Sequence, residues 1–364
     1  MIKKIKLLFV INSLAKGGAE RVFSNIANNL NFLQYDVTVI VFNRFENEYS
    51  LNSNISILNL NVKRSLFGVH KLFKAISSLR PDIVYSTIGQ TNIIVGLMIP
   101  ILKKITPNTL FFMRETSVPS MNNKFSQYPA MLLKCLIKVA YPQFDKIIVQ
   151  GENMKKDLIN NFEIKSESLQ IVKNPVLFTE KRLFINKLSS EIKIIITIGN
   201  LTKIKGYDRL LEIIYELSLN SKIKFEYWIL GEGNERGTIE STILKLGLRD
   251  IVKLQGQVSN VSDYLKRADL LIQGSYYEGF PNSIIEANIY GLPVVAFDVL
   301  GGTSEIIKEG FNGFLVNDND KLKFVEKVLL ALEYSFDREA IVDNITEKHC
   351  VKNIMREYDK LFRN

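Results

Sequence analysis

Short apolar runs and longer stretches with helical spacing alternate along this chain from its first residues. Residues 5–11 form an apolar run interrupted only by Lys6, as expected of a strand buried on both faces of a sheet. Gly17 and Gly18 end the pattern that this strand begins. Residues 19–30 then place their apolar side chains on one stripe, which predicts an amphipathic helix.

This strand-and-helix pattern recurs in two series. The first series predicts further strands near residues 37–42, 55–60, 83–85, 110–113, 146–150 and 170–172, and the second near 193–198, 225–230, 251–254, 270–273, 294–297 and 314–316. Repeated βα units imply parallel sheets covered by helices on both faces. The pattern therefore predicts an α/β protein with two Rossmann-like, doubly wound domains.

The chain length agrees with two domains, because 364 residues exceed one ordinary hydrophobic core. We expect an N-terminal domain over residues 1–175 and a C-terminal domain over 176–346. A polar linker begins at residue 173 and extends to about 190. Residues 347–364 are expected to form a last helix that crosses back to the first domain.

Composition places the chain among globular intracellular proteins. The hydrophobic content is 46%, and no apolar run reaches the roughly 18 residues that span a bilayer. The basic, apolar start is too short for a signal peptide and has no small-residue cleavage site before Gly17. The two cysteines, Cys135 and Cys350, lie far apart, which suits a reducing cytoplasm.

The net charge of +9 is unevenly distributed. Residues 1–175 carry 22 Lys and Arg against 11 Asp and Glu, whereas the remaining residues carry 25 against 27. The excess positive charge of the first half predicts an anionic partner: nucleic acid, a membrane surface or an acidic substrate. Nucleic acid is disfavoured because no recognition motif or basic run with interleaved aromatic residues appears.

Two apolar segments with lysines bear on the choice of partner. They are residues 94–105, which contain Lys103 and Lys104, and residues 130–141, which contain Lys134 and Lys138. Each alone fits a core helix whose lysines reach solvent. Both could instead rest on anionic lipid, and the charge of the whole first half favours an inner-membrane surface.

The most informative stretch for chemistry begins at Glu278 and continues to Glu286, with seven residues between the two carboxylates. Pro281 suits the start of a helix, where a missing N–H costs little. Such a helix begins with unpaired backbone N–H groups that can bind a diphosphate. Carboxylates at both ends of the stretch can accept hydrogen bonds from sugar diols. The stretch thus predicts a nucleotide-sugar site.

These residues resemble the E-x7-E signature of the retaining glycosyltransferases of family 4 (glycosyl transferases group 1), which have the GT-B architecture of two Rossmann-like domains facing across a cleft. Four more segments resemble that family in the expected order: 17–22 (GGAERV), 199–206 (GNLTKIKG), 231–236 (GEGNER) and 301–306 (GGTSEI). Five segments in one order are far more specific than a single motif.

The resemblance implies a role for each matching residue. Glu278 would hold sugar hydroxyls, Glu286 the ribose diol and Lys205 the phosphates, with Glu278 and Lys205 acting in catalysis. The other implied donor-binding residues are Gly17, Gly18, Asn200, Gly279, Phe280, Pro281, Asn282, Ser283 and Ile284. The acceptor is expected on the N-terminal domain, at Glu20, Arg114 and Glu115, and the last two are also candidates for catalysis.

Two positions depart from the family pattern. Many members have an Arg where this chain has Asn200, so neutralisation of the diphosphate would depend more on Lys205 and the helix N-terminus. Many members have a His after the strand near residue 113, where this chain has Arg114. Arg114 is therefore expected near the donor sugar.

No metal or cofactor is expected. Asp318-Asn-Asp320 has the D-x-D form of metal-dependent transferases, but it lies in a turn-rich loop far from the E-x7-E stretch and predicts a turn and a helix cap. His70 and His349 are isolated from other ligands, which predicts structural or surface roles.

The resemblance implies a metal-independent hexosyltransferase, and the charge of residues 1–175 with the two apolar segments predicts a cytoplasmic protein that is peripheral at the inner face of the cell membrane. It would move a sugar from a nucleotide-sugar, a UDP-sugar in the first instance, to a saccharide or lipid-linked saccharide during bacterial surface polysaccharide synthesis, as in capsule or O-antigen, with retention of configuration. A nucleotide-sugar epimerase of the same architecture and a non-catalytic nucleotide-sugar-binding protein remain alternatives.

Overall fold

The computed structural model describes residues 3–45, 48–62, 65–122, 129–177 and 191–363. It divides into two compact units, the first formed by Met1–Leu177 with His349–Asn364 and the second by Phe178–Lys348. The sequence predicts these boundaries at residues 175 and 346. Residues 178–190 of the expected linker lie outside the described residues.

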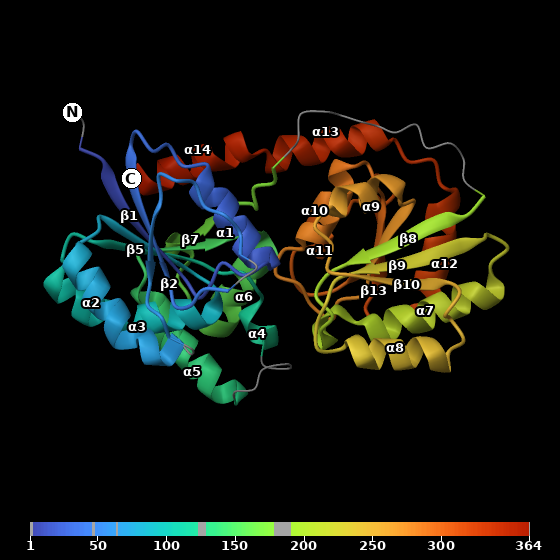
Figure 1. Cartoon of the computed structure of the whole chain (residues 1–364), viewed down its shortest axis with the longest axis horizontal. Helices are drawn as coiled ribbons and strands as arrows, with labels where there is room; N and C mark the ends of the chain where they lie inside the picture. Colours follow the sequence, from blue (N-terminus) through green and yellow to red (C-terminus); the bar gives the residue numbers. More distant parts are fainter. Residues whose placement is uncertain (1–2, 46–47, 63–64, 123–128, 178–190, 364) are drawn as a thin grey trace. The chain divides into compact units, whose positions relative to one another are not determined.

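Unit 1 is built on a seven-stranded parallel sheet with the order β3-β2-β1-β4-β5-β6-β7 (Figure 1). The strands are β1 (Ile5–Ile11), β2 (Tyr35–Val41), β3 (Ser56–Asn59), β4 (Ile83–Thr87), β5 (Leu110–Arg114), β6 (Lys146–Val149) and β7 (Leu169–Ile171). The α-helices are α1 (Gly18–Asn28), α2 (Val69–Leu79), α3 (Gly89–Ile105), α4 (Pro119–Asn122), α5 (Ala130–Ala140), α6 (Glu152–Phe162) and α14 (Val351–Arg363). Short 3-10 turns cover Ser65–Gly68, Tyr141–Gln143 and Ser166–Ser168.

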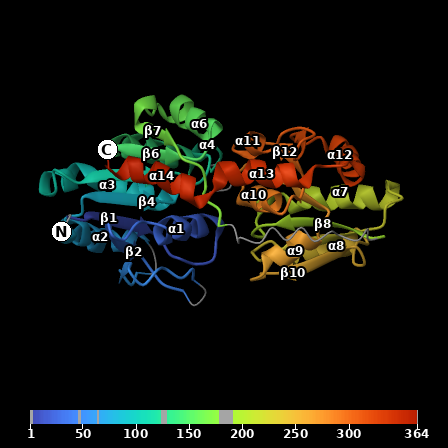
Figure 2. The same ribbon diagram turned by 90° about the horizontal axis from the view of Figure 1, so that it is seen from above.

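Alternate residues of the unit 1 strands supply two separate cores. One core packs against α2, α3, α5 and α6, and the other packs against α1 and α14. Phe9 and Tyr85 lie on the second face, where both contact the ring of Phe362 from α14. Figures 1 and 2 show α14, the red C-terminal helix, lying alongside this N-terminal sheet.

Unit 2 contains a six-stranded parallel sheet with the order β10-β9-β8-β11-β12-β13. The strands are β8 (Lys193–Ile198), β9 (Phe225–Leu230), β10 (Val252–Gly256), β11 (Leu270–Gln273), β12 (Val294–Asp298) and β13 (Gly313–Asn317). The helices are η4 (Lys203–Lys205), α7 (Tyr207–Asn220), α8 (Arg236–Lys245), α9 (Val261–Arg267), α10 (Asn282–Ile289), α11 (Thr303–Ile306), α12 (Lys321–Glu333) and α13 (Arg338–His349).

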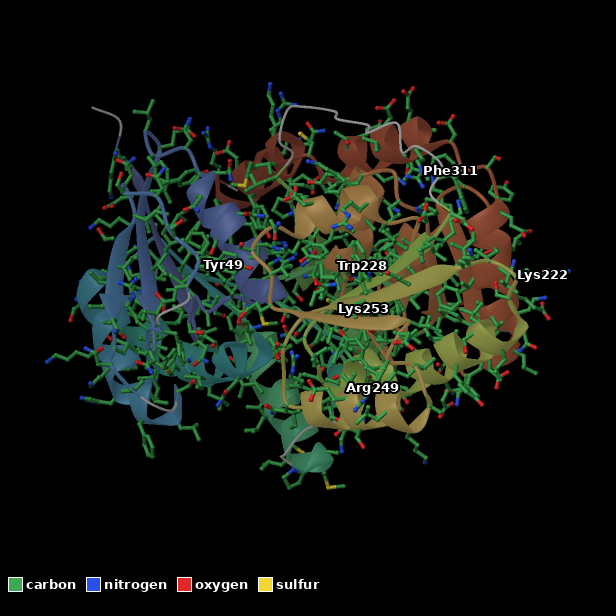
Figure 3. The ribbon with its side chains drawn as sticks, turned by 45° about the vertical axis from the view of Figure 1, so that its right-hand side comes forward. Tyr49, Lys222, Trp228, Arg249, Lys253 and Phe311 are labelled. Atoms are coloured by element: carbon green, nitrogen blue, oxygen red, sulfur yellow. The ribbon has the colours of Figure 1, made fainter. Side chains whose placement is uncertain are left out.

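Helices α7, α8 and α12 pack on one face of the unit 2 sheet. On β9, Trp228 is the register partner of Lys253 on β10, and both are labelled in Figure 3. The guanidinium of Arg267 lies over the Trp228 ring, 4.6 Å from its centroid. Every strand predicted from the sequence is present, and the predicted parallel α/β fold of both halves is confirmed.

Candidate active site

The carboxylate of Glu278 is held at the carboxyl end of the unit 2 sheet. Glu278 lies in the loop between β11 and α10 and is only 8% exposed. Its Oε1 accepts hydrogen bonds from Lys205 Nζ (2.6 Å), Ser275 Oγ (2.6 Å) and Gln273 Nε2 (2.5 Å). Among the described residues no hydrogen bond is made to Oε2. One oxygen thus fixes the carboxylate, and the other remains for a ligand.

Lys205 reaches Glu278 because the loops after β8 and β11 pass close together. Gly206 adopts φ +63°, and a Cβ there would lie 1.9 Å from the Gly274 carbonyl oxygen. Only glycine combines that backbone conformation with that approach. The Lys-Gly pair therefore places the ammonium group of Lys205 beside the carboxylate, and the ammonium is a cation suited to a diphosphate.

Arg209 holds the loop that follows β11 in place. Its buried guanidinium donates to the carbonyl oxygens of Gly274 and Ser275, and to Asp318 Oδ1 at 2.6 Å. Asp318 therefore pairs with an arginine. Asp320 is the N-cap of α12 and accepts from Lys323 N at 3.0 Å, so the predicted helix cap is confirmed.

Gly301 and Gly302 let a second loop pack against Glu278. Gly301 has φ +128°, and a Cβ there would lie 1.7 Å from the Glu278 carbonyl oxygen. A Cβ at Gly302 would lie 2.3 Å from the Phe280 ring. The backbone N–H of Gly302 donates to Gly279 O at 2.9 Å. These contacts hold the Gly-Phe-Pro turn in place.

Helix α10 begins as predicted, with one correction. Pro281 is the N-cap, and no acidic residue occupies the first turn. The sequence predicts unpaired N–H groups at Asn282, Ser283 and Ile284, but the Ile284 N–H donates to the Pro281 carbonyl at 3.2 Å and is therefore already paired. Glu286 lies half-buried on this helix, and Asn200, at the end of β8, is exposed.

In unit 1, Gly17 and Gly18 connect β1 to α1. Gly17 is the helix N-cap and has an extended backbone. A Cβ on Gly17 would lie 2.3 Å from Glu20 Oε2, so the Glu20 carboxylate folds back over the glycine. Burial raises the pKa of Glu20, and a hydrogen bond from its own backbone N–H opposes that rise. A phosphate at this helix N-terminus would compete with Glu20 for space.

Arg114 is the last residue of β5 and is 3% exposed. Its Nη2 donates to Asn174 Oδ1, while its Nε is buried without a hydrogen-bond partner among the described residues. The Asn174 carbonyl in turn meets Nδ1 of buried His349, 2.9 Å away. His349 is therefore a buried structural residue, in agreement with the prediction from its isolated position in the sequence.

The neighbouring carboxylate of Glu115 points into the interior. Oε1 accepts from the N–H groups of Thr116 (2.8 Å) and Ser117 (3.1 Å), and Oε2 accepts from the Tyr141 hydroxyl. Burial raises the pKa of Glu115, and these hydrogen bonds partly offset the effect. Both oxygens of Glu115 are thus used within the protein. This geometry favours a role in holding the loop after β5 over the predicted role in binding the acceptor.

Unit 2 thus joins Lys205 to Glu278 just before α10 begins. In unit 1, Arg114 and Glu115 lie at the end of β5, and Glu20 lies in the first turn of α1. In the part of the chain that the structure describes, no cluster of three or more His, Cys, Asp or Glu side chains could hold a metal ion.

The contacts that hold the site together also involve Gln273, Ser275 and Arg209, which the sequence motifs do not include. Gln273 ends β11 and Ser275 follows it. Polar residues at the carboxyl end of a strand are candidates for a binding site in an open α/β sheet, so these two could have been predicted. The burial of Arg209 could not be predicted in this way, because an arginine within a helical segment is usually exposed to solvent.

Exposed apolar and basic side chains lie on both α3 and α5 of unit 1, two helices that pack together where Gly96 meets Ala140, and we call these residues the α3–α5 surface. Its exposed apolar members are Leu97, Pro100, Ile101 and Ile105 on α3, and Met131, Leu132 and Val139 on α5. Lys104 and Lys134 are exposed beside them. Lys103 pairs with Asp145 and Lys138 with Glu163, so those two lysines are partly neutralised within the unit.

Comparison with known proteins identifies the family. Residues 16–177 match the family described as Glycosyltransferase Family 4, and residues 178–348 match Glycosyl transferases group 1. Since these two matches together cover most of the chain, the protein belongs to the glycosyltransferases that these two family models describe.

Two relatives and one solved structure illustrate the similarity. An alpha-1,4-N-acetyl-D-galactosaminyltransferase of Campylobacter jejuni, named for a PP-undecaprenol-linked saccharide, is 26% identical over 98% of both chains. The amylovoran biosynthesis glycosyltransferase AmsD of Erwinia amylovora is 26% identical over 86% of each. Anabaena HepE, solved with UDP-glucose, superposes with a TM-score of 0.78 at 18% identity over 99% of both chains. The GT-B fold class is thereby confirmed.

Proposed function

We propose that this glycosyltransferase moves a hexose from a UDP-sugar to a lipid-linked saccharide, with retention at the anomeric carbon and without a metal ion. The observation that carries the proposal is the Lys205–Glu278 contact of 2.6 Å, which joins the loops that follow β8 and β11. In this proposal the ammonium of Lys205 is the cation for the departing diphosphate, and Glu278 is the carboxylate for the sugar.

The charges of the reaction match this arrangement. As the glycosidic bond to phosphate breaks, positive charge develops on the sugar ring and negative charge on the leaving diphosphate. The ammonium of Lys205 and the N-terminus of α10 stabilise the diphosphate. Glu278 Oε2 accepts from sugar hydroxyls, and Glu286 accepts from the ribose diol. The retaining outcome rests on the family resemblance.

The relatives support the acceptor class. The Campylobacter jejuni enzyme is named for a PP-undecaprenol-linked saccharide, and AmsD for biosynthesis of the polysaccharide amylovoran. A lipid-linked acceptor requires the enzyme to work at a membrane. In the described residues no helix is long and apolar enough to cross one. The α3–α5 surface supports peripheral contact with the inner, anionic face of a bacterial membrane.

Calorimetric titration with UDP and UDP-sugars tests the donor site. Glu286→Ala should weaken donor binding because a charge-assisted pair of about 1.5–3 kcal/mol is lost. Glu240→Ala provides a control, since it removes a carboxylate from the exposed pair with Arg236 in the same unit. Equal affinities of wild type and Glu286→Ala would remove Glu286 from the site.

A further inference from the structure

Arg114 is a buried cation whose charge has no counter-ion in the described chain. Its guanidinium donates one hydrogen bond, to the neutral side chain of Asn174, and its Nε has no acceptor. The adjacent carboxylate of Glu115 is engaged by Thr116, Ser117 and Tyr141. No ion pair joins Arg114 to any described residue.

Arg209 shows how this chain compensates a buried guanidinium when the role is structural. Arg209 donates to two carbonyl oxygens, pairs with Asp318 and stacks on two aromatic rings. Within the described part of the chain, Arg114 has none of these partners. An arginine stays protonated at all relevant pH values, and a charge kept out of water is costly unless it is paired. The missing partner of Arg114 is therefore an anion.

We propose that Arg114 binds a phosphate group of the acceptor. The inference rests on the proposed function and extends it to an anion subsite in unit 1. Arg114 stands at the carboxyl end of β5, the edge at which open α/β sheets bind ligands. The planar guanidinium matches phosphate oxygens. The donor diphosphate already has Lys205 and α10 in unit 2, whereas an acceptor linked to lipid through a diphosphate brings its own negative charge.

Asn174→Asp provides the sharpest test because it changes charge without changing shape. The new carboxylate keeps the Oδ1 that accepts from Arg114 and adds the missing counter-ion. It should raise the melting temperature and should weaken farnesyl diphosphate binding about ten- to hundredfold, as expected for a competing charged hydrogen bond. Arg114→Gln should weaken it similarly without raising the melting temperature.

The titration uses the full chain, with farnesyl diphosphate and inorganic pyrophosphate as probes, each with and without saturating UDP. Binding of farnesyl diphosphate in the presence of UDP, lost in Asn174→Asp while UDP affinity is kept, supports the subsite. Pyrophosphate that binds equally well shows that the lipid adds nothing to the same anion site, which also supports it.

Unchanged farnesyl diphosphate affinity in Asn174→Asp would overturn the proposal, as would a loss of UDP affinity alone, which would assign the anion to the donor. Failure of the wild type to bind farnesyl diphosphate while it binds UDP would sink the subsite and leave the proposed function standing. Failure to bind any UDP compound would instead count against the proposed function, and the arms without UDP would still report on Arg114.

Discussion

Two buried carboxylates, Glu278 and Glu115, show how one residue type serves different ends in this chain. Oε1 of Glu278 accepts a hydrogen bond from the Lys205 ammonium, which leaves Oε2 for a ligand. The described residues that donate hydrogen bonds to Glu115 are all neutral, and burial raises its pKa. The first carboxylate is equipped for a ligand, and the second fixes the loop that follows Arg114.

The raised pKa of Glu115 predicts a pH dependence of stability. Between the ordinary value of 4.5 and the raised folded value, the folded chain binds more protons at this site than the unfolded chain. The contribution of Glu115 to stability therefore falls as pH rises through that window. Glu115→Gln should flatten this fall in urea titrations made at pH 4 to 7.

Glu163 supplies a control of opposite sign for the same titrations. The hydrogen bond and charge of Lys138 hold the pKa of exposed Glu163 below its usual value. Its contribution is present above the unfolded pKa and is lost as pH falls, so Glu163→Gln should change the slope the other way. A Glu115→Gln profile parallel to wild type would contradict the assignment.

At the scale of elements, α14 completes the first unit although it ends the chain. Tyr358 and Phe362 lie one helical turn apart and enter the core formed by β1, β4 and β5. The Tyr358 hydroxyl meets that of Tyr85 at 3.2 Å, and Asp359 accepts from Tyr35 at 2.6 Å. These polar contacts fix the register of the helix, and the apolar ones provide its stability.

Phe362→Ala should destabilise the protein by about 3–5 kcal/mol, because it removes a ring that is 4% exposed among Phe9, Tyr85 and Phe112. Phe67→Ala is the matched control, since Phe67 is 72% exposed. Urea unfolding measures both variants. Equal effects of the two substitutions would show that α14 does not stabilise the unit.

The elements were predictable because buried parallel strands leave uninterrupted apolar runs in the sequence. The contacts of the site were predictable only in part. Lys205 and the E-x7-E stretch carry local signatures, but the clamp on Glu278 joins residues 73 positions apart through the close approach of Gly206 to Gly274. No local pattern encodes which loop meets which. For the same reason the pairing of Arg209 with Asp318 became visible only in the fold.

At the scale of the whole molecule, the positive charge of residues 1–175 and the α3–α5 surface predict binding to anionic membranes. Each exposed lysine near such a surface contributes about 1 kcal/mol, and salt screens the attraction. The double variant Lys104→Gln, Lys134→Gln should lower partition into phosphatidylglycerol vesicles about tenfold or more. Liposome flotation at low and high salt measures it.

The control double variant is Lys222→Gln with Arg249→Gln, two exposed residues of unit 2 labelled in Figure 3, which removes the same charge elsewhere. It should float like wild type. A wild type that ignores these vesicles at low salt would end the membrane proposal and point to an acidic soluble glycan.

The most direct measurement is sugar transfer itself. The protein is incubated in EDTA with radiolabelled UDP-sugars and a bacterial membrane lipid extract, and the products are separated and their anomeric linkage is determined. We predict label in a lipid-linked saccharide with the donor's anomeric configuration, abolished in Glu278→Gln and Lys205→Met. Isomerised UDP-sugar, binding without transfer, an inverted linkage, or turnover that returns only when magnesium or manganese is added would contradict the account.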